Sequence, residues 1–523
     1  MKLRFSEIFN AKNCFLLLFF SIHFVKAQIP NISYSTPNSL NVGISISPIS
    51  PTNSGGMVSN QTLVTTYAGS GLEGSTNGNG IQASFNLPTV VTANAAGIVY
   101  VVDRINHLIR KITTNGDVTT FAGTGLAGST DGLGTAASFN YPDAAVVDAN
   151  GNLFVTDQSN HKIRKITPEG LVNTFAGSGT IGATDGQGIN AKFYYPAGIA
   201  VDANNNLLVA DYGNNKIRKI TPEGLVSTFA GSGVSGTLDG NVLTAQFNGA
   251  TGVCIDSFGT VFAADYFNNT IRKIDTSGEV TTLAGNGTPG ESDGFGANAS
   301  FYYPAIIAVD AQNNLFVTDE QNHKIRKILV SGEVTTYAGT GNLGATDGAT
   351  NVAEFNFPTG VFVDVFQNIY IADYGNNKIR KIKTYGYSIV PILPAGLVFD
   401  ANNGTISGTP TTSFPATNFT VTASNISGES TFILTLEANQ LSTEEFQQSS
   451  IKYYPNPVEN TLQVSSTEKM NSIAIFNILG QEIKKYLVNE NASKIDFSIL
   501  ESGIYWVKVK TISGENGFKI SRK

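Results

Sequence analysis

Apolar and polar residues alternate in short runs through residues 62–383, and turns rich in Gly, Asn, Asp and Pro separate the runs. One stretch shows the pattern in four β-branched segments, at 197–202, 206–210, 216–220 and 225–230. Alternation with a period of two predicts half-buried strands, whereas an amphipathic helix needs an apolar period of about 3.6 residues. No such helical period runs through this region. We therefore expect antiparallel four-stranded meanders.

The meander repeats at a constant step of 54 residues, without insertion or deletion. One phenylalanine marks each copy: Phe85, Phe139, Phe193, Phe247, Phe301 and Phe355. Four-stranded units that repeat at about this length are typical of propeller blades.

Residues 201–220 read Val-Asp, then Asn-Leu-Leu-Val-Ala-Asp, then Asn-Lys-Ile-Arg-Lys-Ile. This pattern resembles the NHL repeat family, and the resemblance covers all six copies. It implies a six-bladed β-propeller. The copy that ends at Lys383 has no fourth strand after it, but Thr62–Gly69 supplies a matching segment at the start. We expect this N-terminal strand to complete the last blade, which removes free sheet edges and brings residues 62 and 384 together.

The segments 387–400, 403–411 and 419–436 resemble Ig-like modules of bacterial surface proteins. The region 387–438 is short for a β-sandwich of about 100 residues. Residues 32–60 carry pieces that look like the missing opening strands. We therefore expect the propeller to be inserted in a split Ig-like domain, as is tolerated when the ends of the inserted domain lie close together. The alternative is a disordered leader followed by a truncated sandwich.

The last region contains Tyr454-Pro-Asn-Pro457, Ile475–Gln481, Gly503–Val509 and a basic end at Lys519–Lys523. These pieces resemble the C-terminal sorting domain of the type IX secretion pathway of Bacteroidota. The resemblance implies a type IX export machinery as partner, and a location that is secreted or at the outer-membrane surface.

The predicted fold class is all-β: a six-bladed propeller inserted in an Ig-like β-sandwich, plus a small C-terminal β-sandwich. The expected boundaries are a signal peptide 1–27, Ig-like parts 28–61 and 385–438, the propeller 62–384, a linker 439–452 and a sorting domain 453–523.

The first residues are basic, an apolar run at 14–22 follows, and Ala27–Gln28 fits a signal-peptide cleavage site. The formal net charge is −7 for the whole chain; the leader contributes +3, so the chain from Gln28 onward carries −10. This acidic balance argues against nucleic acid as a partner. After the leader, Cys254 is the one remaining cysteine and no run reaches the length of a membrane helix.

An aspartate and an arginine recur seven residues apart in every repeat. We interpret each as a structural ion pair, with the two residues opposite each other across a hairpin. The pairs are Asp103 and Arg110, Asp157 and Arg164, Asp211 and Arg218, Asp265 and Arg272, Asp319 and Arg326, and Asp373 and Arg380.

The long loops and the turns between the second and third strands should share one face of the propeller, where loops on a rigid scaffold carry function. The residue after the aspartate differs between blades, as Arg104, Tyr212, Tyr266 or Tyr374, and Asp143 is the one acid where the inner strands begin. These five are the candidate ligand-binding residues, because tyrosines stack on sugars or anchor protein partners. Packing between loops is the alternative. The blades are expected to differ mainly in their rim loops and little at the axis.

His107, His161 and His323 occupy one turn position where other blades have Asn, which indicates a turn role. The Asp-Gly turns of the Asp131 type lack the carboxylate density of a calcium loop, so we predict no metal and no cofactor. The chain is expected to be an exported binding or adhesion protein for a protein or glycan, without catalytic residues. The alternative is a propeller enzyme of lyase or lactonase type.

Overall fold

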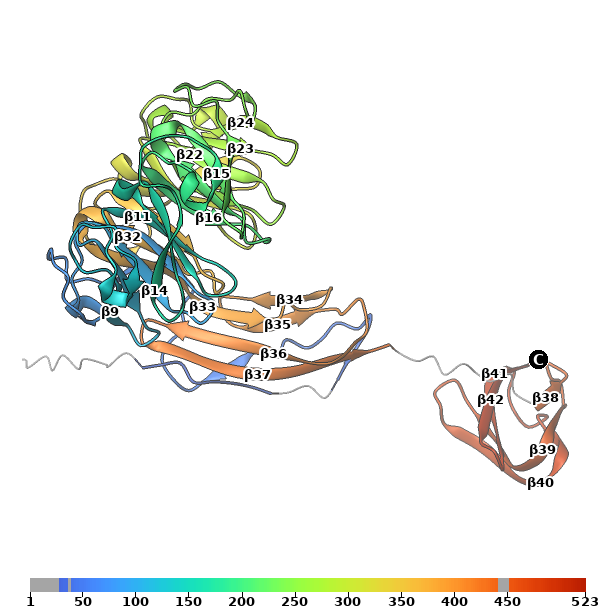
Figure 1. The fold of residues 1–523 in the computed structure, drawn as a ribbon. Coiled ribbons are helices and arrows are strands. Elements are labelled where there is room, and N and C mark those ends of the chain that lie inside the picture. The colour runs from blue at the N-terminus through green and yellow to red at the C-terminus, as the bar shows by residue number, and fades with distance from the viewer. Residues whose placement is uncertain (1–27, 36–38, 441–450) are drawn as a thin grey trace, which may run out of the picture.

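The computed structural model describes residues 28–35, 39–440 and 451–523 of the chain. The predicted signal peptide 1–27 lies outside the described residues, as does most of the predicted linker. In the part that is described, no helix is long and apolar enough to cross a membrane. The fold is all-β, and Figure 1 shows the blades arranged around one axis.

Each blade is an antiparallel sheet that runs outward from the axis. The inner strands are apolar because both of their faces are covered, by the neighbouring blades. They are β6 (Pro88–Ala93), β11 (Pro142–Val147), β16 (Pro196–Val201), β21 (Ala250–Ile255), β26 (Pro304–Val309) and β31 (Pro358–Val363).

The second strands end at the repeated aspartate, and the third strands carry the repeated arginine. The second strands are β7 (Val99–Asp103), β12 (Leu153–Asp157), β17 (Leu207–Asp211), β22 (Val261–Asp265), β27 (Leu315–Asp319) and β32 (Ile369–Asp373). The third strands are β8 (Leu108–Ile112), β13 (Lys162–Ile166), β18 (Lys216–Ile220), β23 (Thr270–Ile274), β28 (Lys324–Ile328) and β33 (Lys378–Val390).

The outer strands are β9 (Asp117–Ala122), β14 (Leu171–Ala176), β19 (Leu225–Ala230), β24 (Glu279–Ala284), β29 (Glu333–Ala338) and β4 (Gln61–Ala68). A fifth strand of two residues, which the four-strand interpretation missed, pairs with each outer strand. These short strands are β5 (Gly78–Asn79), β10 (Gly132–Leu133), β15 (Gly186–Gln187), β20 (Gly240–Asn241), β25 (Gly294–Phe295) and β30 (Gly348–Ala349).

Three-residue 3₁₀ helices occupy two kinds of loop. Those that follow the short strands are η1 (Gly80–Gln82), η2 (Gly134–Ala136), η4 (Gly188–Asn190) and η7 (Gly296–Asn298). Those between the second and third strands are η3 (Gln158–Asn160), η5 (Tyr212–Asn214), η6 (Tyr266–Asn268), η8 (Glu320–Asn322) and η9 (Tyr374–Asn376).

The last blade is closed by the N-terminal strand, as the sequence predicts. β4 lies antiparallel to β33, with partners from Ala68 opposite Ile379 to Gln61 opposite Tyr385. β33 does not end at the propeller. It continues to Val390 and pairs with β36 (Phe414–Asn425), which pairs with β37 (Gly428–Asn439). One strand therefore belongs to both domains.

Strands from both sides of the propeller form the Ig-like domain. β2 (Leu40–Asn41) lies parallel to β37, and β1 (Ile32–Tyr34) pairs with β3 (Pro51–Asn53). The hairpin of β34 (Leu397–Asp400) and β35 (Thr405–Gly408) joins the N-terminal segment through an antiparallel bridge between Ile406 and Ile49. The shared core contains Ile32, Tyr34 and Ile49 from before the propeller and Ile406, Phe419, Val421, Leu434 and Leu436 from after it. The insertion in the predicted fold class is thus confirmed.

The C-terminal domain is a β domain with its own apolar core, which includes Met470, Ile475 and Val507. Its strands are β38 (Ile451–Tyr454), β39 (Thr461–Phe476), β40 (Glu482–Asp496), β41 (Gly503–Thr511) and β42 (Glu515–Arg522). β39 is the central strand, and it pairs with β38, β40 and β41.

Candidate functional site

The repeated aspartate and arginine form an ion pair in all six blades. In the first blade, Arg110 Nη1 lies 2.9 Å from Asp103 Oδ2, and both side chains are fully buried. The expected register was wrong: Asp103 lies opposite Leu108, and Arg110 lies opposite Val101. The pair is diagonal because four residues form the turn between the strands, so Arg110 lies two residues beyond the partner of Asp103.

Each arginine also organises the long loop in front of its blade. Nη1 of Arg164 donates to the backbone carbonyl of Ser138, and Nη2 donates to the carbonyl of Thr130 and to Asp131 Oδ1. Its guanidinium carbon lies 5.3 Å from the centroid of Phe139, the repeated phenylalanine. The Asp-Gly aspartates are therefore arginine partners, which gives the repeated Phe, Asp and Arg one structural role.

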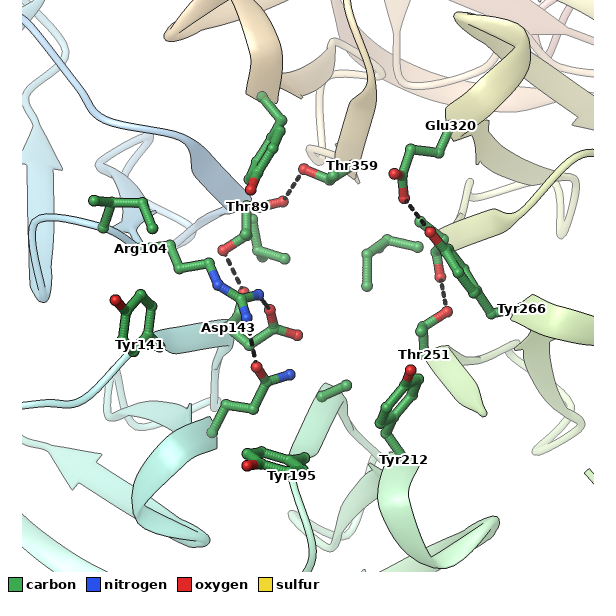
Figure 2. A pocket seen from close by; sticks show the side chains of 17 residues that line it. Thr89, Arg104, Tyr141, Asp143, Tyr195, Tyr212, Thr251, Tyr266, Glu320 and Thr359 are labelled. Atoms are coloured by element: carbon green, nitrogen blue, oxygen red, sulfur yellow. Dashed lines mark hydrogen bonds and ion pairs between the residues drawn. The ribbon is translucent and has the colours of Figure 1, made fainter. Parts of the chain in front are cut away.

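The buried aspartate fixes the loops that lead to the axis. Oδ1 of Asp211 accepts the backbone N–H of Tyr194 at 2.8 Å, and Oδ2 accepts the side-chain amide of Asn214. The residue after the aspartate is thereby held at the start of a tight turn. Its side chain points toward the axis in each blade where Figure 2 labels it, as Arg104, Tyr212, Tyr266 and Glu320 show.

The histidines connect neighbouring blades. His161 adopts φ 55° at the end of its turn, and its Nδ1 accepts the backbone N–H of Tyr195 in the next blade at 3.2 Å. Asn215 has the same left-handed conformation and accepts the N–H of Gly249 through Oδ1. Burial lowers the pKa of His161, which keeps the ring neutral and able to accept. His and Asn interchange here because both offer an acceptor at the same place.

A cavity of about 610 Å³ opens at the axis on the long-loop face. Its polar and aromatic lining is shown in Figure 2. The lining residues include Thr89, Arg104, Tyr141, Asp143, Gln158, Tyr195, Tyr212, Thr251, Tyr266, Glu320, Thr359 and Tyr374.

All five candidate ligand-binding residues line this one cavity: Arg104, Asp143, Tyr212, Tyr266 and Tyr374. The expectation that the blades differ mainly at the rim was wrong. The variable residue of each blade is the first residue of the turn, and all six of these side chains surround the axis. The blades are therefore alike in their scaffold and different in the cavity.

Arg104 and Asp143 form an ion pair at one side of the cavity. Nη2 of Arg104 also donates to Gln158 Oε1 at 2.6 Å. Burial raises the pKa of Asp143, and the charge of Arg104 opposes that shift. The threonines at the inner-strand entries donate to backbone carbonyls, as Thr89 does to Asp143 and Thr359 does to Thr89. These hydroxyl groups join neighbouring blades.

Glu320 lies at the opposite side, where Tyr266 Oη donates to its Oε2 at 3.1 Å. Burial raises the pKa of Glu320 to about 7. Hydrogen bonds from Tyr266 and Gln321 lower the pKa, the Asp143 charge raises it, and the Arg104 charge lowers it. Tyr266 in turn stacks on Tyr303, with ring centroids 4.7 Å apart. The cavity thus holds a second acid in a fixed position.

Sequence reasoning did not select Glu320, Gln158, Tyr141 or Tyr195 as site residues, although all four line the cavity. Glu320 and Gln158 are the repeat equivalents of Arg104 and Tyr212, so the constant step was a signal for them. Tyr141 and Tyr195 have φ of 49° and 50°, an uncommon conformation for residues other than glycine. That conformation is a feature of the backbone, and the residue types alone do not reveal it.

Below the cavity the channel becomes apolar. A second hollow of about 230 Å³ is lined mainly by Val, Ile and Ala of the inner strands, with Cys254 among them. Val90 and Ile306 line both hollows and therefore lie at their boundary. The polar chemistry of the axis is confined to the long-loop end.

Among the described residues, no group of three or more His, Cys, Asp or Glu side chains is placed to hold a metal ion. His107, His161 and His323 each bond to a backbone N–H of the following blade, so they do not converge. The arrangement at the axis is suited to hydrogen bonding, aromatic stacking and charge recognition.

Fold and site together define a six-bladed propeller with an axial cavity. Residues 193–220 match the family described as NHL repeat, residues 366–439 match "Putative Ig domain", and residues 452–521 match "Secretion system C-terminal sorting domain". The chain is an NHL repeat protein with an Ig-like domain and a C-terminal type IX secretion sorting domain. The sorting domain implies secretion or attachment at the cell surface.

Two curated relatives share the repeat region. NHL repeat-containing protein 2 of Bos taurus is 29% identical over 349 residues, which cover 59% of this chain and 47% of the relative. Protein SUPPRESSOR OF QUENCHING 1, chloroplastic, of Arabidopsis thaliana is 28% identical over 277 residues, which cover 49% of this chain and 26% of the relative. The chain thus spans less than half the length of either relative.

A solved structure shares the fold. It is a Bacteroides thetaiotaomicron protein described as of unknown function, with a TM-score of 0.51 and 17% sequence identity. The match covers 67% of this chain and 87% of that chain.

Proposed function

We propose that this exported protein is a non-catalytic binding protein that holds the end of a glycan, or a glycan of one or two sugars, in the axial cavity. The observation that carries the proposal is the convergence of one variable side chain from each blade on a cavity of about 610 Å³. Cavities of this size bury small ligands, and a few placed polar groups orient them. Tyrosines among those groups supply stacking surfaces for sugar rings.

The geometry favours a glycan over a folded protein partner. A protein partner of ordinary affinity covers roughly 800 Å² of each surface, whereas this site is concave and confined to the axis. Hydroxyl-rich ligands suit a cavity that offers the carboxylates of Asp143 and Glu320, the amide of Gln158 and phenolic groups.

Absence of catalysis is part of the proposal. Asp143 is paired with Arg104, and the threonine hydroxyls are used between blades. The second candidate, a lyase or lactonase type of enzyme, is favoured by one observation: a carboxyl group whose pKa is about 7 suits general acid–base work, and Glu320 is such a group. Mass spectrometry of each bound glycan after prolonged incubation separates the two, because only an enzyme yields a product of altered mass.

A glycan array probed with the full chain tests the binding proposal. Ala305→Trp fills the cavity and should abolish the signal, and Tyr212→Ala should weaken it by removing one wall. Ala95→Trp makes the same kind of change in an exposed turn outside the cavity lining and serves as the control. Circular dichroism and thermal melting establish that each variant is folded. Binding that Ala305→Trp and Tyr212→Ala both leave intact would contradict the proposal.

A further inference from the structure

The charges in the axial cavity do not balance. Three ionisable acid or base side chains other than tyrosines line it: Arg104, Asp143 and Glu320. Arg104 is paired with Asp143. In the described part of the chain, Glu320 forms no ion pair, and its side-chain partner across the blades is the phenol of Tyr266. When Glu320 is ionised, the cavity carries one negative charge in excess.

Because Glu320 is largely buried, this excess negative charge raises the free energy of the folded protein. A carboxylate withdrawn from water is destabilised unless a cation or several hydrogen-bond donors compensate it. Hydrogen bonds from Tyr266 and from the neighbouring Gln321 favour the ionised form of Glu320, while Asp143 repels it and Arg104, already bound to Asp143, attracts it. Its pKa of about 7 is consistent with incomplete compensation by the side chains of the protein. The site lacks one positive charge beside Glu320.

The side of the cavity that lacks this charge is rich in tyrosine. Figure 2 shows Glu320, Tyr266 and Tyr212 together, across the cavity from Arg104 and Asp143. Tyr374 lines the cavity as well. Aromatic faces attract organic cations, and a carboxylate beside them adds a direct ionic contact. Acid and aromatic groups in this combination favour an ammonium group over a neutral or anionic one.

We infer that the axial cavity selects ligands that carry a compact organic ammonium group, as an amino sugar does, and that this group lies between Glu320 and the tyrosines Tyr212 and Tyr266. The inference rests on the proposed binding function of the cavity and names its ligand class. The Arg104–Asp143 pair and Gln158, at the other side of the cavity, can then form hydrogen bonds with the hydroxyl groups of the ligand.

The same contacts predict how the protonation of Glu320 changes when an ammonium ligand binds. An ammonium group stabilises the ionised form of Glu320 and lowers its pKa from about 7. Binding near neutral pH therefore releases a proton from the carboxyl group. The affinity for a permanent cation should rise as pH increases from 5.5 to 8, because the carboxylate is then already formed.

The test compares cationic ligands with neutral ligands of the same shape, by calorimetry on the full chain. Choline is compared with 3,3-dimethylbutan-1-ol, in which carbon replaces the nitrogen, and glucosamine with glucose, in which a hydroxyl group replaces the ammonium group. We expect each cation to bind at least tenfold more tightly than its neutral counterpart, with choline measured at pH 8 and glucosamine at pH 7, where its amino group is still largely protonated. Glu320→Gln should reduce the difference to less than threefold. Runs with choline at pH 7, in two buffers of different ionisation enthalpy, should detect the released proton.

The outcomes are distinguishable. If choline binds and glucosamine does not, the ammonium inference stands and the amino sugar is excluded as its source. Equal binding of each cation and its neutral counterpart overturns the inference, and if Ala305→Trp abolishes that binding, the proposed cavity function survives. If no probe binds in the cavity and the glycan array is also negative, both proposals fail. Tight cation binding that Glu320→Gln leaves unchanged overturns the assigned role of Glu320.

Discussion

The hydroxyl group of Tyr266 donates a hydrogen bond to the carboxyl group of Glu320, and the two residues occupy the same repeat position in neighbouring blades. This contact joins side chains that lie 54 residues apart in the sequence. It connects the repeat architecture to the chemistry of the axis, because the constant scaffold places two unlike residues in contact.

The stability of the propeller should depend on pH through Glu320. Its pKa in the folded chain is about 7, above the ordinary 4.5, so the ionised form is disfavoured by folding. The free-energy cost of ionising Glu320 in the folded chain is absent below pH 4.5. It grows between pH 4.5 and pH 7 and levels off above pH 7 at about 3 kcal/mol. Glu320→Gln should therefore raise the melting temperature at pH 8 and leave it unchanged at pH 4. The exposed Glu279→Gln is the matched control. An equal effect of Glu320→Gln at both pH values would contradict this explanation.

Arg218→Lys should destabilise the propeller by about 3 kcal/mol or more. The arginine serves Asp211, Asp185 and two backbone carbonyls from a fully buried position, which a lysine ammonium cannot match in geometry. Urea unfolding measures the change, and Lys219→Arg on the same strand is the control. A loss under 0.5 kcal/mol would show that the repeated pair does not carry the stability we assign to it.

The turn histidines should be replaceable by asparagine but not by alanine. His161→Asn keeps an acceptor for the N–H of Tyr195 and tolerates the left-handed backbone, as Asn215 does in the next blade. We expect a change within about 0.5 kcal/mol for His161→Asn and a loss of about 1–2 kcal/mol for His161→Ala. Thermal unfolding of the two variants checks this. Equal losses in both would mean that the ring itself, through its packing on Tyr195, is what the site requires.

Removal of the C-terminal domain should block export without unfolding the propeller. The domain has its own core, and its strands pair only with one another among the described residues. In a host with a type IX pathway, a chain that stops after residue 440 should accumulate in the periplasm. Cell fractionation measures this, with the full chain as control. Surface delivery of the shortened chain would refute a sorting role.

Most of the architecture followed from the sequence because it is encoded locally. The repeat at Asn206–Thr221 fixes strands and turns within one blade, and the surplus strand at Thr62 predicts closure. The cavity was harder to predict, since each blade contributes one side chain and no single segment contains the site. Glu320 occupies the repeat position of Tyr266, but the direction of its side chain depends on the turn that Asp319 orders. The diagonal register of the ion pairs likewise depends on the turn length.

The continuous strand β33 has a mechanical consequence. A pull on the Ig-like domain reaches the propeller along the axis of β33, whose partners in β4 form seven antiparallel residue pairs. Hydrogen bonds loaded along the strands share the force and break together, whereas those at a hairpin end open one by one. A force that a surface-bound ligand applies at the cavity therefore acts on the last blade, where β4 and β33 pair. The hydrogen bonds between these two strands resist the force in shear. The pairing of β4 with β33 that completes the last blade should therefore also resist mechanical unfolding of the propeller.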